Sequence, residues 1–380
     1  MAPPVTRVAV IGLGGMGNHH AEAVREEPGC ELAGGAEIDA DRGRAWGERF
    51  GAPVCDDYER LLDETAPDVA VIATQAPQHE APVLAAAGRG VHVFCEKPIA
   101  LDLVQADRMV AACRDHGVKL AINHIKRASP FNGHAKEWIE AGRIGRVIRL
   151  QAANKGGRRA GNELMEMGTH LYDWLRLFGG DVEWLHGHLT QLDGRESGLA
   201  DIRRTQEVNP GDRDAGLVLG ERAFVSLRFR GGVHADVGFA AETATDDDNY
   251  GIDIVGTEGR IALRRSVGTR MFFHRGAHMG PGDAWEPVPL PEEDLDEAGN
   301  PRDRDSKRRF LQRLMLRDLI EAAARDREPL SSGADGRDCL EMIHATYESH
   351  RRRARVEMPL TPRQHPLERW RREATGEGGP

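Results

Sequence analysis

The chain has 380 residues, of which 40% are hydrophobic and 29% are charged, and its 51 basic and 61 acidic side chains give a formal net charge of −10. This length exceeds the roughly 250 to 300 residues at which a single hydrophobic core stops growing, so we expect two domains. The negative charge repels phosphate backbones and anionic membrane surfaces, which argues against nucleic acid and membrane partners.

The cysteines are few and widely scattered, and they form neither a CxxC pair nor a zinc-like cluster: Cys30, Cys55, Cys95, Cys113 and Cys339. This usage predicts reduced thiols and no metal site. No apolar run approaches the roughly 20 residues that span a bilayer, and no leader-like segment precedes Val5. We therefore expect a cytoplasmic protein.

Up to about residue 122, short β-branched runs alternate with longer amphipathic stretches. The expected strands cover residues 5–11, 31–38, 68–73, 91–95 and 118–122. The expected helices cover residues 19–26, 41–50, 58–64, 79–89 and 101–116, the last with Asp102 at its start. This alternation is typical of a parallel sheet covered by helices, so we predict an N-terminal Rossmann domain of α/β class over residues 1–123.

The second part of the chain reads as α+β. After a helix at residues 134–141, the expected strands cover residues 146–152, 223–230, 233–239, 252–255, 260–263 and 269–274. Gly-containing turns separate several of them, which predicts an open, mostly antiparallel sheet. Loops are expected over 193–213 and 276–305, and helices over 307–325 and 336–352. We assign 124–360 to a substrate-binding and oligomerisation domain and 361–380 to a tail without a core pattern.

A glycine turn follows the first expected strand. Its GxGxxG spacing lets the backbone approach a pyrophosphate at the positive end of the next helix; it comprises Gly12, Leu13, Gly14, Gly15, Met16 and Gly17. Glu37 ends the second strand twenty residues later, as a ribose-binding carboxylate should. The alternative is a glycine-rich turn without a ligand and a surface carboxylate. Because Glu37 would repel a 2′-phosphate, NAD is expected rather than NADP, although Arg42 and Arg44 could accommodate NADP.

The fourth expected strand runs into Glu96, Lys97 and Pro98. Open parallel sheets bind ligands at the carboxyl ends of their strands, and Pro98 biases Lys97 toward an extended backbone. The simpler alternative is a solvated lysine in a loop.

In these features the chain resembles the Gfo/Idh/MocA family of nicotinamide-dependent oxidoreductases, and the resemblance covers nearly the whole sequence. The family pairs a Rossmann domain carrying the EKP motif with an open-sheet α+β domain. The matching motifs are VAVIGLGGMG ending at Gly17, VAVIAT ending at Thr74 with His79 behind it, FCEKP around Lys97, Arg127 with Ser129 and Pro130, GRIG ending at Gly145, and GTHLYDWL from Gly168.

The resemblance implies a His and an acidic residue opposite the EKP lysine, and the matching positions are His170 and Glu166. Asp173 lies one turn further, and residues three or four apart share a helical face if the segment is helical. His170 would accept the hydroxyl proton while Lys97 stabilises the developing alkoxide. The reverse assignment is open, as is a purely structural role for His170 and Asp173 at a helix start.

Further positions follow from the same resemblance. Thr74, Gln75, His79 and Glu96 are expected beside the cofactor, and Arg127, Asn154, Lys155 and Asp173 beside the substrate. Three positions depart from the family pattern. Glu166 replaces the Asp of many polyol-oxidising relatives, Gln75 replaces a common Pro, and Glu37 replaces a commoner Asp. The longer Glu166 side chain leaves the substrate open, since about 1 Å of misplacement costs roughly 10²-fold in rate.

The leading functional hypothesis is NAD-dependent hydride transfer between nicotinamide and a secondary alcohol or ketone of a sugar, sugar derivative or cyclitol. One alternative is a glycoside-cleaving enzyme in which tightly bound NAD oxidises the sugar transiently. Another is a non-catalytic NAD-binding sensor. The resemblance also implies a homodimer or homotetramer formed through the exposed face of the second-domain sheet.

Overall fold

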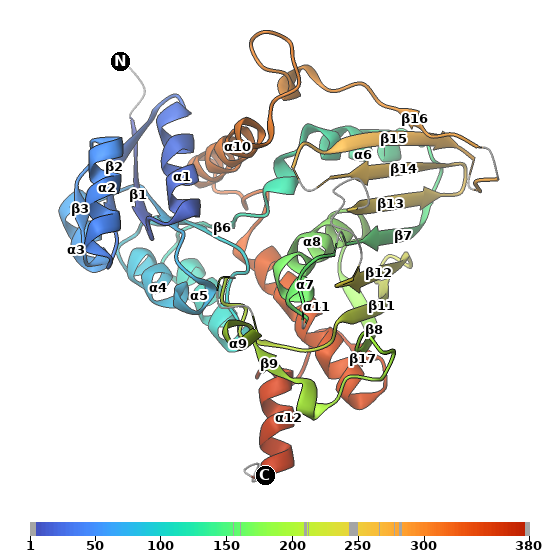
Figure 1. The fold of residues 1–380 in the computed structure, drawn as a ribbon. Helices are drawn as coiled ribbons and strands as arrows, with labels where there is room; N and C mark the ends of the chain where they lie inside the picture. The colour runs from blue at the N-terminus through green and yellow to red at the C-terminus, as the bar shows by residue number, and fades with distance from the viewer. Residues whose placement is uncertain are drawn as a thin grey trace. The chain divides into compact units, whose positions relative to one another are not determined.

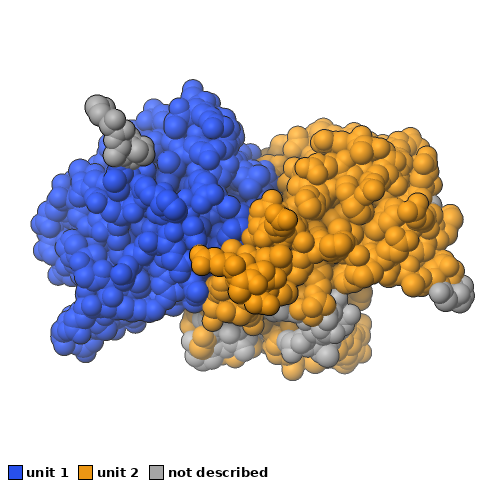
Figure 2. Space-filling view, turned by 90° about the horizontal axis from the view of Figure 1, so that it is seen from above, with its two compact units in different colours: residues 1–128, 308–337 blue, residues 129–307, 338–380 orange. Residues whose placement is uncertain are grey.

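The computed structural model describes residues 5–154, 156–159, 161–208, 211, 213–242, 250–265, 267–276, 278–280 and 283–376 (Figure 1). The chain divides into two compact units, shown in different colours in Figure 2. Unit 1 comprises residues 1–128 and 308–337, and unit 2 comprises residues 129–307 and 338–380. Within the described ranges, no helix is both long and apolar enough to cross a membrane.

Unit 1 is built on a parallel sheet with the strand order β3-β2-β1-β4-β5-β6. The strands are β1 (Thr6–Ile11), β2 (Cys30–Ala36), β3 (Val54–Cys55), β4 (Val69–Ile72), β5 (His92–Cys95) and β6 (Leu120–Ile122). This is the strand order of a dinucleotide-binding Rossmann sheet, in which the winding reverses between β1 and β4. The predicted Rossmann fold is confirmed.

Five helices connect the strands of this sheet, and an aspartate caps the start of three of them. They are α1 (Gly15–Glu26), α2 (Ala40–Phe50), α3 (Tyr58–Thr65), α4 (Glu80–Gly88) and α5 (Leu103–Asp115). The side chains of Asp39, Asp57 and Asp102 accept hydrogen bonds from the first backbone amides of α2, α3 and α5. A carboxylate at this position offsets both the orphan amides and the positive helix end, so each aspartate fixes where its helix starts.

Helix α10 (Arg304–Ala324) packs with unit 1, although it follows the second-domain sheet in the sequence. Met315, Leu316 and Leu319 are buried in the same core as residues of β1, β4 and α1. On its polar side, Arg313 and Arg317 pair with the buried carboxylate of Glu27 at the end of α1, at 3.2 and 2.8 Å. Apolar burial and ion pairs therefore join two segments that are far apart in the sequence.

Unit 2 contains a nine-stranded sheet with the order β16-β15-β14-β13-β7-β12-β11-β8-β17. The strands are β7 (Val147–Ala153), β8 (Val182–Thr190), β11 (Arg222–Phe229), β12 (His234–Ala240), β13 (Gly251–Gly256), β14 (Gly259–Arg264), β15 (Arg270–Arg275), β16 (Glu286–Pro287) and β17 (Val356–Glu357). Only β7 and β12 pair in parallel among these strands. The predicted open, mostly antiparallel sheet is confirmed.

Helices of unit 2 cover one face of this sheet. The unit contains α6 (Pro130–Glu140), α7 (Asn162–Glu166), α8 (Gly168–Gly179), α9 (Thr205–Val208), most of α11 (Gly333–Arg352), α12 (Pro366–Thr375) and the small hairpin of β9 (Arg203–Arg204) with β10 (Leu217–Val218). Helix α8 contacts β7, β12 and β13. Along β8 and β11, buried residues alternate with exposed ones such as His186, His188 and Phe224, so the opposite face is open.

The structure adds elements that the sequence patterns do not predict. Strand β3 has two residues and β8 lies in a segment with polar alternation, and neither is among the expected strands. Residues 308–337 pack with unit 1, whereas the predicted second domain begins at residue 124 and runs without interruption to 360. The segment predicted as a tail without a core pattern contains α12, whose Leu367 is fully buried.

Candidate functional site

The glycine turn between β1 and α1 is held together by two glycines that tolerate no side chain. Gly12 has a φ of +91°, and a Cβ there would lie 2.8 Å from the backbone of Ala73. A Cβ on Gly17 would lie 2.0 Å from the carbonyl oxygen of Gly12. The turn therefore depends on close backbone approach between β1, β4 and α1.

The middle of the turn is open instead. A Cβ on Gly14 or Gly15 would meet no atom within 4 Å, and α1 begins at Gly15. Between them and β1, the side chain of Leu13 is fully buried, and Met16 is half-buried in the first turn of α1. Exposed backbone at the positive end of a helix is the geometry that binds a pyrophosphate, so this turn fits a dinucleotide.

Glu37 follows β2 and points back at the glycine turn. One carboxylate oxygen accepts a hydrogen bond from the Leu13 amide at 3.0 Å, and the other accepts one from the Asp39 amide at 3.1 Å. The guanidinium of Arg42, which is half exposed, lies 3.1 Å from the same carboxylate. Glu37 is 8% exposed. Oε1 meets both the Asp39 amide and Arg42, whereas Oε2 meets the Leu13 amide and retains a second lone pair that can accept from a ribose hydroxyl.

A cleft of about 510 Å³ opens at the carboxyl ends of β1, β2 and β4. Its lining combines the expected glycine turn and Glu37 with residues that the sequence reasoning missed, among them Ile38, Tyr58, Pro77 and Pro82. Ile38 is 87% exposed, which is unusual for an isoleucine. Apolar walls beside an acidic ribose-binding group suit a flat heterocycle such as adenine. In the sequence, these apolar walls are indicated by the isoleucine at position 38, directly after Glu37.

Thr74, Gln75 and His79 lie around the end of β4. Thr74 and Gln75 line the cleft. His79 is buried behind them, where its Nδ1 and Nε2 each lie 3.2 Å from a backbone carbonyl oxygen, of Ile99 and Thr74 respectively. Burial lowers the pKa of His79 despite these carbonyl contacts. The structure therefore places His79 as a support between β4 and the segment after Lys97, and not in the cleft lining.

Glu96 and Lys97 directly follow β5 and differ in burial. Glu96 is 3% exposed, and its carboxylate accepts hydrogen bonds from the ring of His20 at 2.8 Å and from the side chain of Asn123 at 2.7 Å. Lys97 is half-buried. The structure thus turns the first residue of the EKP motif into the interior of unit 1.

In unit 2, Glu166 is the last residue of α7 and His170 lies in the first turn of α8. Met167 joins the two helices with nearly helical dihedral angles, φ −97° and ψ −24°, so Glu166 and His170 lie on consecutive turns. Glu166 is 6% exposed and His170 is half-buried. The condition that this segment be helical is met.

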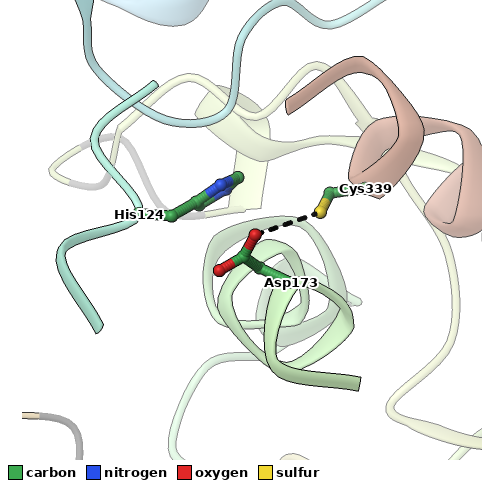
Figure 3. Close-up of side chains that lie close together, drawn as sticks. All are labelled: His124, Asp173 and Cys339. Carbon is green, nitrogen blue, oxygen red and sulfur yellow. Dashed lines mark hydrogen bonds between the residues drawn. The ribbon is translucent and has the colours of Figure 1, made fainter. Parts of the chain in front are cut away.

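Asp173 is fully buried, one turn beyond His170. The Cys339 thiol of α11 donates a weak hydrogen bond to its carboxylate at 3.9 Å (Figure 3). This contact links α8 to α11.

Two further substrate candidates are engaged by neighbouring protein groups. Arg127 donates to the carbonyl oxygen of Leu330 at 2.8 Å and to Asp335 at 3.1 Å, all within unit 1. Asn154, at the end of β7, donates to the buried Glu163 of α7 at 2.5 Å. Lys155, the third candidate, lies outside the described residues.

Comparisons with known proteins match both halves of the chain. Residues 6–124 match the family described as oxidoreductase family, NAD-binding Rossmann fold. Residues 136–358 match oxidoreductase family, C-terminal alpha/beta domain. Together the two matches cover far more than half of the chain.

Individual relatives agree with this assignment. The chain is 28% identical to the D-apiose dehydrogenase of Paraburkholderia graminis, over 92% of this chain and 89% of that protein. It is 32% identical to the 2,7-anhydro-N-acetylneuraminate hydratase of Mediterraneibacter gnavus, but over only 49% of this chain and 47% of that protein. Among solved structures, levoglucosan dehydrogenase in complex with NADH and levoglucosan has a TM-score of 0.75 at 20% identity, covering 93% of this chain and all of that one. That likeness shows the fold.

Proposed function

Because the chain belongs to the Gfo/Idh/MocA family of oxidoreductases, we propose that it transfers hydride between the nicotinamide of NAD and a secondary alcohol or ketone of a sugar, sugar derivative or cyclitol. The observation that carries the proposal is the cleft of unit 1, in which Gly12, Gly14 and Glu37 lie together at the end of a Rossmann sheet. The family description of residues 6–124 includes NAD binding, and the geometry of the turn fits that group.

NAD is the proposed cofactor in preference to NADP. Glu37 is held at the cleft by two backbone amides, so its carboxylate cannot swing away from a 2′-phosphate without losing both hydrogen bonds. A fixed negative charge at this position opposes a second one. Arg42 lies against Glu37 and offsets part of that charge, so we expect a preference for NAD and not an absolute exclusion of NADP.

The bound nicotinamide supplies a hydride acceptor, and the protein must handle the proton and the charge on oxygen. We propose that His170 accepts the hydroxyl proton and that the Lys97 ammonium stabilises the developing alkoxide. Lys97 follows β5 and His170 lies in α8, and both side chains are half-buried. Glu166 is proposed to orient the substrate hydroxyls beside His170.

Among the remaining substrate candidates, Arg127, Asn154 and Asp173 are proposed to act indirectly. Each already bonds a neighbouring group, respectively Asp335, Glu163 and Cys339. Breaking such a bond to engage a sugar hydroxyl would leave the other partner unsatisfied, at a cost of about 1–3 kcal/mol where that partner is buried, as Glu163 is. Lys155 remains a proposed substrate contact.

The names of the relatives guide the substrate class. D-apiose and levoglucosan are both hydroxyl-rich carbohydrates, which is why a carbohydrate or polyol is proposed for this chain. The glycoside-cleaving and sensor alternatives are not favoured by these dehydrogenase relatives. The test is to incubate the purified protein with NAD and a panel of sugars, anhydrosugars and cyclitols, and to follow the absorbance of reduced nicotinamide. Turnover with one class supports the proposal, and silence across the panel contradicts it.

A homo-oligomer formed through the open sheet face of unit 2 is also proposed. A shallow hollow on this face is lined by His186, His188, Phe224, Ser226 and Gly238, and Phe224 is 55% exposed. On this face Arg149 forms an ion pair with Asp236, so these two charges need not repel a second copy of the face. Light scattering on the wild type and on Phe224→Glu tests this, with a smaller particle expected for the variant.

A cytoplasmic location is also proposed. The five cysteines are free thiols, which is typical of proteins in a reducing compartment.

A further inference from the structure

The carboxylate of Glu96 is held from two sides inside unit 1. Its Oε1 atom accepts from His20 Nε2 at 2.8 Å and from Asn123 Nδ2 at 2.7 Å. All three residues are at most 3% exposed. A buried carboxylate is costly unless donors satisfy it, so this arrangement fixes the Glu96 side chain strongly.

The two donors come from different parts of the Rossmann sheet. Asn123 follows β6, and its backbone amide also donates to the carbonyl oxygen of Cys95 at 2.8 Å. His20 lies in α1, and the edge of its ring packs on Phe94 of β5 with 5.1 Å between ring centroids. The ring contact restricts rotation of the imidazole, so the Nε2 atom stays directed at Glu96.

Lys97 is the residue directly after this fixed point. Its backbone amide lies 3.3 Å from the other oxygen of Glu96. Two residues later, His79 contacts the carbonyl oxygen of Ile99 at 3.2 Å. The backbone on both sides of Lys97 is therefore anchored to buried side chains, which limits where its ammonium can lie.

From this geometry we propose that His20 and Glu96 are positioning residues for Lys97, and that Glu96 does not itself contact the cofactor. His20 belongs to the helix whose first turn would face the pyrophosphate. The same helix therefore contributes to cofactor binding and to placement of the lysine, so a shift of α1 would move both. This inference rests on the proposed function for the role of Lys97 in turnover, but the placement of Lys97 can be measured without turnover.

The test compares substitutions that remove or keep the donor. His20→Leu removes it, and His20→Gln keeps a side-chain N–H. Asn123→Ala removes the second donor independently, in case His20→Leu does not fold. His19→Gln is the matched control, because His19 is the neighbouring residue of the same helix and contacts Glu22 and Arg308 instead. Thermal unfolding confirms that each variant is folded.

We expect His20→Leu to lower kcat by about 10²-fold, the cost of roughly 1 Å of misalignment. NADH affinity, followed by fluorescence, should change little. His20→Gln should recover most of the rate, Asn123→Ala should lower kcat in the same direction, and His19→Gln should match the wild type. An unchanged kcat in His20→Leu, a loss confined to NADH affinity, or equal losses in His20→Leu and His20→Gln would overturn the proposal.

Labelling of Lys97 separates this inference from the proposed function. The rate at which an amine-directed acylating reagent modifies Lys97, measured by peptide mass spectrometry, should differ between wild type and His20→Leu and return with His20→Gln. If the wild type turns over no substrate, the proposed function fails while this measurement still decides the inference. Identical labelling rates in all variants would refute the positioning role.

Discussion

The Glu37 carboxylate accepts a hydrogen bond from the backbone amide of Leu13 at 3.0 Å, which ties the end of β2 to the glycine turn after β1. Glu37, which we propose discriminates between NAD and NADP, therefore also stabilises the glycine turn. A substitution that removes the charge but keeps an acceptor separates these two roles.

Glu37→Gln is expected to shift cofactor preference toward NADP. The amide oxygen can keep one of the two backbone hydrogen bonds, while the negative charge that opposes the 2′-phosphate is lost and Arg42 becomes available to it. The ratio of kcat/KM for NAD to that for NADP should fall by about 10-fold, equivalent to about 1.4 kcal/mol. A ratio equal to that of the wild type would show that Glu37 does not discriminate between NAD and NADP at the 2′ position of the ribose.

An added methyl group should have different effects at Gly17 and at Gly14, two glycines of the same turn. In Gly17→Ala the new Cβ would lie 2.0 Å from the Gly12 carbonyl oxygen, so the turn must distort. We expect the free energy of unfolding to fall by about 1–3 kcal/mol, as for other overpacked sites. Chemical denaturation measures this.

Gly14→Ala is the matched partner of that variant. A Cβ at Gly14 meets no protein atom within 4 Å, and the φ of −70° suits alanine. Its stability should equal that of the wild type, while NADH affinity should fall because the methyl group occupies space near the pyrophosphate. Equal NADH affinity in Gly14→Ala and the wild type would place the cofactor elsewhere.

We expect the free energy of unfolding to fall at acid pH because of a buried histidine at the start of the C-terminal helix α12. His365 is buried at the start of α12, where its Nδ1 accepts a hydrogen bond from the Leu367 amide, and burial lowers its pKa to about 3. The folded pKa is below the unfolded one, so the unfolded chain binds the proton more readily. The contribution of neutral His365 is present in full above about pH 6.5 and is lost as the pH falls toward 3.

His365→Asn should reduce this loss, because asparagine can cap the helix and does not titrate. Between pH 7.5 and pH 5, the wild type should lose about 2 kcal/mol more stability than the variant. Urea unfolding at the two pH values measures the difference, with the exposed His116→Asn as control. A pH dependence identical in the wild type and in His365→Asn would contradict the assignment.

Local patterns predicted the elements whose residues repeat regularly, such as β1 and the Asp102-capped helix α5. They missed β3, whose two residues are too short to show a period, and β8, whose outward-facing His186 and His188 interrupt a recognisable apolar run. The position of α10 could not be read from order along the chain. Which core a helix joins depends on the complementarity of its buried face, here Met315, Leu316 and Leu319 against unit 1.

For the site, spacing predicted the glycine turn and Glu37, because chain geometry alone brings strand ends to one edge of a parallel sheet. It could not predict that Glu96 turns inward to His20 and Asn123, since a carboxylate beside Lys97 reads equally well as a ligand or as a buried support. It also could not show that Arg127 and Asn154 already have protein partners, which only tertiary contacts reveal.

The central claim is that His170 and Lys97 act in the same step of NAD-dependent oxidation, His170 by accepting the hydroxyl proton and Lys97 by stabilising the alkoxide. A double-mutant cycle tests this claim directly. With a substrate found in the panel, Lys97→Met and His170→Asn are each expected to lower kcat by about 10² to 10⁴-fold, with NADH affinity retained. Residues that act as a unit have non-additive effects, so the double variant should be little worse than the poorer single variant. If the two losses multiply, or if either variant keeps wild-type kcat, the two side chains do not share the step and the account is contradicted.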